Sequence, residues 1–330
     1  MSPSMFWRPA WRQLASLMAA TLLALSMAAH AEEAKKRSGK VKRADEVRTA
    51  GKKMKVTARK VSARRAVMPR DHLVGAHPTL RSASALVLDQ RTGEVLFEKN
   101  AGAVVPIASI TKLMTAMVTI DAVPDLREEI TISTDDVDTL KGSSSRLRVG
   151  TVMTREDALL LALMSSENRA AHALSRYYPG GTPAFVAAMN RKAQELGMRQ
   201  THFVDPTGLS SNNVSTATDL AKMVAAAHNY ALIREFSTTN RALVDLGRRQ
   251  LGFHNTNALV ASPSWEIGLS KTGFIQEAGK CLVMQAWVTG RPVVLVLLDS
   301  YGRMTRIGDA NRIKLWMEKT ASSGRKSVGS

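Results

Sequence analysis

The chain has 330 residues, of which 45% are hydrophobic and 22% charged, so it can form a sizeable core and is neither wholly disordered nor collagen-like. Its single cysteine excludes an internal disulfide, a cysteine-based zinc site and an iron–sulfur cluster. The formal net charge of +18 is concentrated near the N-terminus, where residues 32–70 contain 15 Lys and Arg against four Asp and Glu. The rest of the chain is only mildly basic.

Residues 1–31 have the pattern of a secretory signal peptide. Arg8 and Arg12 form a positive N-terminal region, an apolar run follows, and residues 29–31 (Ala-His-Ala) fit a small-x-small cleavage site. The apolar run, about 16 residues long, is shorter than the ~20 residues that a membrane-spanning helix needs. We therefore expect export to the periplasm with cleavage after residue 31, and a retained membrane anchor is the alternative.

Residues 32–82 alternate Lys and Arg with small residues and contain no aromatic ring. Such a segment cannot bury enough surface to offset the entropy lost on ordering, so we expect a disordered tether. The positive charge of residues 32–70 suits an anionic membrane or wall surface, and a solvated linker fits the composition equally well. Nucleic acid is not an expected partner, because export would separate the chain from it.

A two-stranded hairpin begins the folded part, which we expect to cover residues 83–320. Strand patterns at 85–89 and 95–98 flank a turn that contains a glycine, Arg91-Thr-Gly93. A helix is predicted next, over 110–119, with one apolar face.

The middle section, about residues 120–240, is dominated by helices. Two stretches in it combine apolar residues at helical spacing with a polar N-terminal cap, 154–164 and 216–228. Three strand patterns and a final helix follow, at 267–275, 281–288, 293–298 and 308–319. We expect residues 321–330 to form a short disordered tail. Strands at both ends with helices between them predict an α+β fold, an antiparallel sheet flanked by helices with an inserted helical subdomain.

Three short patterns contain the candidate catalytic residues: Ser109-Ile-Thr-Lys112, Ser166-Glu-Asn168 and Lys271-Thr-Gly273. Serine and lysine three residues apart at the start of a helix share one face, and the helix N-terminus favours a nucleophilic oxygen and an oxyanion. A free lysine titrates near ~10.4, so a lysine base needs desolvation or a cationic neighbour, for which Lys271 is the candidate. Each pattern alone is common, but the three in this order match the motif set of class A β-lactamases and penicillin-binding proteins.

Longer segments, 106–116, 203–209 and 271–283, resemble the low-molecular-weight penicillin-binding proteins, the serine D-Ala-D-Ala peptidases of bacterial cell walls. The resemblance covers about residues 82–320. Ser-Glu-Asn in the second motif, and a chain that ends soon after its last helix, are most similar to the D-alanyl-D-alanine endopeptidase branch.

The resemblance implies a β-lactamase/transpeptidase-like fold and a serine acyl-enzyme, without cofactor or metal. The expected substrates are the peptide stems of peptidoglycan, cleaved at cross-links between D-Ala and meso-diaminopimelate, and β-lactams are expected covalent inhibitors. A carboxypeptidase that removes the terminal D-Ala of pentapeptides is the alternative, because both reactions use the same bond chemistry.

The resemblance also implies a catalytic role for individual residues. Ser109 would attack the carbonyl carbon of a D-alanine, Lys112 would accept its proton, and Ser166 would pass a proton to the leaving amine. The backbone N–H groups of Ser109 and Phe274 would form the oxyanion hole, where each donor is commonly worth ~3 kcal/mol of transition-state stabilisation.

Four further residues would bind the substrate. Asn168 would hydrogen-bond the amide on the acyl side of the cleaved bond. Lys271 and Thr272 would receive a carboxylate near that bond, and Gly273 would leave room for substrate backbone beside the strand.

Two other functions are less favoured. A class A β-lactamase needs a carboxylate that activates water, and no Glu-x-x-x-Asn element follows Ser166 in the expected region, where 203–208 forms a turn with a structural Asp205. A catalytically silent wall-binding protein has no need for the complete motif set. The histidines show no pair at metal-ligand spacing, and we expect Cys281 to be a packed side chain in an apolar strand.

Overall fold

The computed structural model describes residues 77–122, 125–247, 249–302 and 304–327, with side chains up to residue 323. The chain divides into two units, 1–68 and 69–330, and all described residues belong to the second. The signal peptide expected at 1–31 and the tether up to residue 76 lie outside the described residues. Among the helices that are described, none combines the length and apolar character needed to cross a bilayer.

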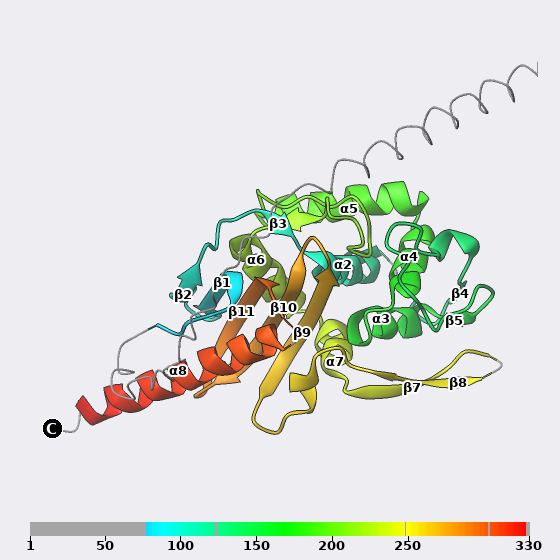
Figure 1. Ribbon diagram of the computed structural model, residues 1–330. Coiled ribbons are helices and arrows are strands. Elements are labelled where there is room, and N and C mark those ends of the chain that lie inside the picture. The colour runs from blue at the N-terminus through cyan, green and yellow to red at the C-terminus, as the bar shows by residue number, and fades with distance from the viewer. Residues whose placement is uncertain (1–76, 123–124, 248, 303, 328–330) are drawn as a thin grey trace, which may run out of the picture. The chain divides into compact units, whose positions relative to one another are not determined.

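A five-stranded antiparallel sheet forms the framework, in the order β2-β1-β11-β10-β9 (Figure 1). Its strands are β1 (Ser82–Asp89), β2 (Val95–Lys99), β9 (Glu266–Ile275), β10 (Gly279–Val288) and β11 (Arg291–Ser300). The sequence predicted all of these strands to within a few residues. The first strand lies beside the last, so that Val87 of β1 pairs with Leu295 of β11, and β9 lies at the edge of the sheet.

The central strands are buried on both faces, which explains their nearly continuous apolar sequences. In β11, Val294 and Val296 belong to the core on one face, whereas Val293 and Leu295 belong to the core on the other. This alternation follows from the two-residue period of a strand. Each fully buried Val or Leu side chain contributes about 1.5–3 kcal/mol relative to exposure, so both cores stabilise the sheet.

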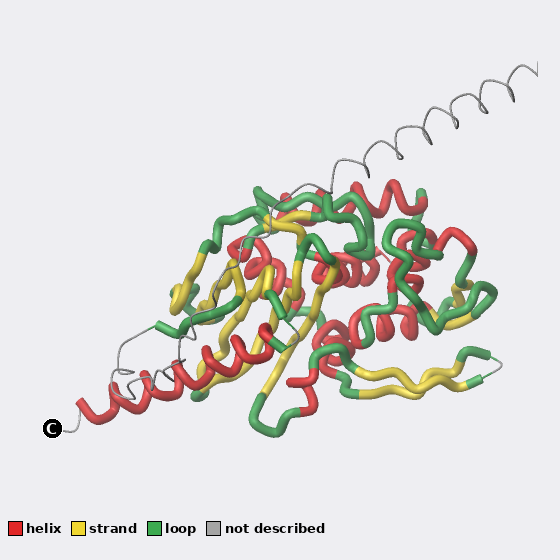
Figure 2. Tube along the Cα trace, in the orientation of Figure 1, coloured by secondary structure: helices red, strands yellow, loops and turns green. Residues whose placement is uncertain are grey.

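Helices cover both faces of the sheet (Figure 2). The last helix, α8 (Thr305–Ser327), packs on β1, β10 and β11, and α6 contacts the same strands from the inserted helical subdomain. That subdomain contains the 3-10 turn η1 (Ala108–Thr111) and the helices α2 (Lys112–Ala122), α3 (Arg155–Met164), α4 (Asn168–Arg176), α5 (Gly181–Glu195), α6 (Ala217–Ala227) and α7 (Ala231–Thr238). The predicted α+β fold with inserted helices is confirmed.

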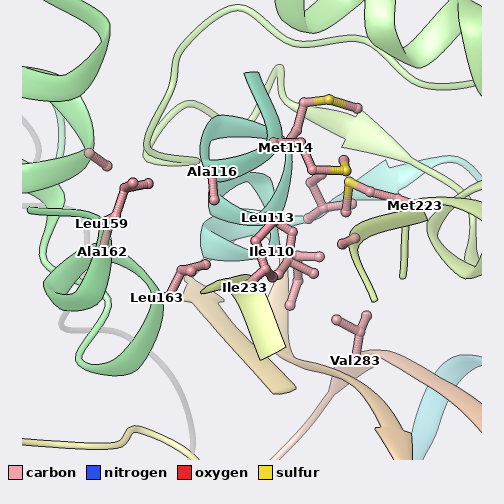
Figure 3. Packing of buried hydrophobic residues seen from close by; sticks show 14 of the residues in the cluster. Ile110, Leu113, Met114, Ala116, Leu159, Ala162, Leu163, Met223, Ile233 and Val283 are labelled. Atoms are coloured by element: carbon pink, nitrogen blue, oxygen red, sulfur yellow. The ribbon is translucent and has the colours of Figure 1, made fainter. Parts of the chain in front are cut away.

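Helix α2 is the centre of the larger core (Figure 3). Every residue from 111 to 119 is buried, because α3, α4, α5, α6 and α7 pack on this helix. Figure 3 shows Leu163, Met223 and Ile233 around it. The sequence predicted a single apolar face for this helix. Thr115, one of its two threonines, donates from Oγ1 to the Pro206 carbonyl at 2.6 Å.

The remaining elements are short. They are β3 (Val105–Pro106) paired with β6 (Val214–Ser215), β4 (Glu129–Thr131) paired with β5 (Val152–Thr154), β7 (Arg241–Asp245) paired with β8 (Gln250–His254), and the 3-10 turns η2 (Thr134–Asp136) and η3 (Ala258–Ala261). The β7–β8 hairpin was not predicted. Most of its side chains are exposed or half-buried, so its sequence lacks the apolar alternation of a half-buried strand.

Two predicted boundaries were wrong. The fold begins before residue 83, since Leu80 is buried and both the N–H and the Oγ of Ser82 donate to Asp309 Oδ2, at 2.7 and 2.6 Å. Helix α8 continues to Ser327 instead of giving way to a disordered tail at 321. Neither glycine nor proline occurs at positions 309–323, and the hydroxyl of Ser323 donates to the Lys319 carbonyl of the preceding turn, as serines in helices do.

Candidate active site

Ser109 lies in η1, three residues before the start of α2, on a turn that two close contacts hold in place. Its neighbour Ala108 has a left-handed φ of 49°, a conformation that costs about 1–2 kcal/mol for a residue with a Cβ. Gly208 packs so closely on this turn that a Cβ at that position would lie 1.9 Å from the Ala108 carbonyl oxygen. Asp205 fixes the glycine turn by accepting the N–H of Thr207 and Gly208 at 2.6 and 2.7 Å. Asp205 is thus structural, as expected.

The ammonium of Lys112 reaches Ser109. Its Nζ donates to Ser109 Oγ at 2.9 Å, to Asn168 Oδ1 at 2.7 Å and to the Thr207 carbonyl at 2.7 Å, which uses all three of its protons. Burial lowers the pKa of Lys112 to about 7, against the opposing charges of Asp205 and Glu167. Near neutral pH a large share of these amines is therefore neutral, and a neutral amine at this position can accept the Ser109 proton.

Lys271 lies on β9 and reaches the second serine. Its Nζ donates to Ser166 Oγ at 2.9 Å and to the Thr272 carbonyl at 3.0 Å. Ser166 occupies the turn between α3 and α4 with a φ of 61°. The sequence left two possible causes for a lowered pKa of Lys112, desolvation or a cationic neighbour such as Lys271, and burial is the cause of that shift. The charge of Lys112 acts on Lys271 instead. Burial and the nearby charges of Lys112 and Arg306 hold the pKa of Lys271 well below its usual value.

Asn168, the first residue of α4, has both ends of its amide fixed. Its Oδ1 accepts from Lys112, and its Nδ2 donates to Ser143 Oγ at 2.9 Å. The neighbouring Glu167 holds the same loop, because Ser145 Oγ donates to Glu167 Oε2 at 2.6 Å. The loop at 143–145 therefore borders the site.

Strand β9 passes close to the serine. A Cβ on Gly273 would lie 2.9 Å from the Ile107 carbonyl oxygen and 3.2 Å from the Ser109 nitrogen, so glycine is needed for η1 and β9 to approach. We expected this glycine to make room for substrate, and the structure shows that it makes room for the turn that carries Ser109. Thr272 Oγ1 lies 2.7 Å from Thr256 Oγ1, and Phe274, the next residue after Gly273, is exposed.

The structure brings all of the predicted site residues into one region, and it adds some that sequence reasoning missed. Arg306, at the start of α8, donates from Nη1 to the carbonyls of Gly273 and Cys281, at 3.0 and 3.3 Å. No local pattern identifies Arg306, because its place follows from the packing of α8 on the sheet. Glu167 could have been considered, since it lies inside the second motif. Thr256 was missed because it lies in the connection that follows the unpredicted hairpin.

Other reactive side chains in the described part of the molecule have structural surroundings. Cys281 is buried in β10, and burial raises the pKa of its thiol to about 11, so it is a protonated, packed side chain. His172 Nδ1 lies 2.8 Å from Asp136 Oδ1, and Arg176 forms an ion pair with the other oxygen of the same buried carboxylate. No group of three His, Cys, Asp or Glu residues that could hold a metal ion occurs among the described residues.

Comparison with known proteins relates this geometry to a family. The family model described as D-alanyl-D-alanine carboxypeptidase matches residues 72–302. A D-alanyl-D-alanine endopeptidase of Pseudomonas aeruginosa is 52% identical over 241 residues, which cover 72% of this chain and 78% of that protein. The protein of the same name from Escherichia coli is 46% identical over 245 residues, with 74% and 79% covered.

Solved structures confirm the transpeptidase-like fold. The Streptomyces K15 DD-transpeptidase superposes with a TM-score of 0.67 at 30% identity, over 73% of this chain and 98% of that one. The ampicillin-bound form of penicillin-binding protein D2 from Listeria monocytogenes superposes with a TM-score of 0.65 at 28% identity, over the same shares.

Proposed function

The chain belongs to the D-alanyl-D-alanine carboxypeptidase family of serine peptidases, and we propose that it is a D-alanyl-D-alanine endopeptidase that hydrolyses D-Ala–meso-diaminopimelate cross-links of peptidoglycan through an acyl-enzyme on Ser109. One observation supports the chemistry above all others: the buried amine of Lys112, with its pKa lowered to about 7, lies 2.9 Å from Ser109 Oγ. The relatives at 46% and 52% identity are named endopeptidases, whereas a carboxypeptidase of Bacillus subtilis is only 32% identical. The endopeptidase is therefore favoured.

Acylation begins with the neutral amine of Lys112. It accepts the hydroxyl proton of Ser109 while Oγ attacks the D-alanyl carbonyl carbon, forming a C–O bond and a tetrahedral oxyanion. The backbone N–H groups of Ser109 and Phe274 stabilise that oxyanion, at ~3 kcal/mol per donor. The C–N bond then breaks, and the leaving amine takes a proton from Ser166, which regains one from the protonated Lys112, so that the amine of Lys112 is neutral again.

Deacylation returns the enzyme to its starting state. Water attacks the ester carbon, its proton passes to the amine of Lys112, and the C–O bond to Ser109 breaks with return of a proton to Oγ. The products are a peptide that ends in a D-Ala carboxylate and a free diaminopimelate amine, so the cross-link is opened.

Substrate binding uses the edge strand and the charges behind it. An extended peptide can lie along the free side of β9, where backbone hydrogen bonds hold it as an added strand. Asn168 hydrogen-bonds the acyl-side amide, and Lys271 with Thr272 holds the carboxylate on the leaving side. Arg306 adds positive charge at the carbonyl of Gly273. β-Lactams present a similar carbonyl to Ser109, and the ampicillin-bound relative supports this part of the proposal.

The site of action that we propose is the periplasm, on the basis of the export pattern of residues 1–31. Residues 32–70 would add attraction to an anionic membrane or wall surface. Binding of the chain to isolated sacculi, compared with a variant that lacks residues 32–70, tests this: the attraction should weaken on deletion and with added salt.

Cleavage assays test the activity. The purified chain and a Ser109→Ala variant are incubated separately with a cross-linked muropeptide dimer and with a pentapeptide monomer, and the products are followed by mass. Conversion of the dimer to monomers by the parent chain alone supports the endopeptidase. Loss of one alanine from the pentapeptide, with the dimer intact, would instead identify a carboxypeptidase. If neither substrate changes and penicillin does not acylate Ser109, the enzyme proposal is wrong.

A further inference from the structure

An ion pair lies across the two walls of the site. Lys141 Nζ is 2.5 Å from Glu277 Oε1, and the two side chains are 31% and 44% exposed. Lys141 belongs to the loop between η2 and β5, on the helical side, whereas Glu277 belongs to the turn between β9 and β10. Residues from two separate parts of the chain thus meet at this point.

The loop that carries Lys141 is preformed. Asp138 accepts from the N–H groups of Leu140 and Lys141 through Oδ1, at 2.8 and 3.0 Å, and from the N–H of Ser143 through Oδ2 at 2.7 Å. Ser143 in turn accepts from the amide of Asn168 at 2.9 Å. Lys141 is therefore two residues from a side chain that touches the catalytic centre, on a backbone that is already fixed.

The direction of β9 places the ion pair on the acyl side of the reaction. The strand passes Lys271 and Thr272, to which the proposed function assigns the carboxylate on the leaving side, then Phe274, and its turn reaches Glu277. A donor peptide bound to Ser109 must leave the serine in the opposite direction from the leaving group. It therefore extends past Phe274, whose side chain is 59% exposed, towards Glu277 and Lys141.

We propose that Lys141 and Glu277 form a subsite for the zwitterionic side-chain end of the diamino acid that precedes the scissile D-Ala in the donor peptide. This inference rests on the proposed function, in which the donor residue is diaminopimelate, with one ammonium and one carboxylate at the end of its side chain. Lys141 pairs with the carboxylate and Glu277 with the ammonium. The exposed face of Phe274 contacts the methylene chain between the backbone and that end.

The exchange of partners is balanced in charge. One protein ion pair opens and two ion pairs to the substrate form, so no charge is left without a partner. An exposed ion pair adds little to stability, so little is lost when it opens. The ammonium of Lys141 holds the pKa of Glu277 below its usual value through a hydrogen bond, so the carboxylate is charged at neutral pH.

The test compares three ligands on Lys141→Ala, Glu277→Ala and the charge-swapped pair Lys141→Glu/Glu277→Lys. The ligands are a diaminopimelate muropeptide dimer, the same dimer with lysine in the donor position, and a fluorescent penicillin. The matched control is Lys192→Ala, which removes an ion pair to Asp121 of the same 2.5 Å length and similar exposure, with side chains 22% and 40% exposed.

Each single variant should raise KM for the diaminopimelate dimer about tenfold with little change in kcat, the effect of losing one charged contact. With the lysine dimer, which has the ammonium but lacks the carboxylate, only Glu277→Ala should raise KM. Penicillin acylation should stay within about twofold of the parent in every variant, because penicillin has no such side chain. The control should match the parent with all three ligands.

Two results would overturn the subsite. One is single variants with a parental KM for the diaminopimelate dimer. The other is a parallel loss of penicillin acylation, which would mean that the ion pair only holds the site together. In each of these results the parent still cleaves the dimer, so the proposed function stands. A parent chain that acylates with penicillin but cleaves neither dimer contradicts the proposed function and the subsite together.

Discussion

The lowered pKa of Lys112 predicts how acylation of Ser109 depends on pH. In the proposed mechanism the neutral amine is the base, so the rate follows the neutral fraction. With a pKa of about 7, about one amine in eleven is neutral at pH 6 and about ten in eleven at pH 8, so the acylation rate constant should rise about tenfold across this interval. The measurement is the second-order rate constant of labelling by a fluorescent penicillin at a series of pH values.

Glu167→Gln is the perturbation that tests the origin of this profile. The Glu167 carboxylate raises the pKa of Lys112, so its removal should lower that pKa and move the midpoint of the profile to lower pH. Glutamine keeps an oxygen that can accept from Ser145, which preserves the loop. The variant should therefore acylate faster than the parent at pH 6 and at the same rate at pH 8.

A matched control is Glu128→Gln, which removes a carboxylate that pairs with Arg155 outside the site. Its profile should coincide with that of the parent. A parental profile that is flat between pH 6 and 8 would refute Lys112 as the titrating base. A midpoint that moves to higher pH in Glu167→Gln would refute the electrostatic reasoning.

Three further predictions concern stability, measured by thermal or denaturant unfolding. Gly208→Ala should lower the free energy of unfolding by at least about 3 kcal/mol, because its Cβ would overlap the Ala108 carbonyl. Gly93→Ala, also at a positive φ but with open space around it, should lower it by only about 1 kcal/mol. Asp309→Ala should lower the free energy of unfolding by about 3 kcal/mol, because it leaves the buried N–H and hydroxyl groups at the start of β1 without their acceptor. A loss below about 1 kcal/mol would contradict the role of Asp309 in holding this strand. The folded pKa of Lys112 lies below its unfolded value, so the native chain binds fewer protons and its stability should rise with pH from about 7 to about 10.5. Lys112→Met should therefore exceed the parent in stability by up to a few kcal/mol at pH 6, and that margin should shrink by pH 9.

The sheet and the motif residues were predictable because their signals are local. Strands β10 and β11 are continuous apolar runs, and Ser109 with Lys112 follows from the spacing of two residues on one turn. The order of three such motifs was enough to identify the family and the residues that meet in the site. The close packing of η1 on β9, by contrast, could not be predicted from the sequence. It follows from the structure, in which Gly273 lies next to the Ser109 nitrogen.

The residues that sequence reasoning missed depend on contacts between distant segments. Arg306 reaches the site because α8 packs on the sheet. The burial of α2 on every side was not predicted either. A helix that other helices surround has no polar face, so its pattern does not show which side packs on the core. Sequence reasoning left desolvation and a cationic neighbour as alternative causes of the Lys112 pKa shift, because burial is a property of the fold and not of the motif.

The pairing of β1 with β11 has a consequence for the timing of folding. Ser82 and Ser300, which face each other across these strands, are 218 residues apart in the chain. At a synthesis rate of about 5–20 residues per second, β1 waits on the order of 10–40 seconds before its partner strand exists. Throughout this interval the apolar side chains of β1 have no native neighbour on that side. A nascent chain of this topology must be kept from aggregating until its last strand is made, and the active site, which needs β9, cannot form earlier than the closing steps of synthesis.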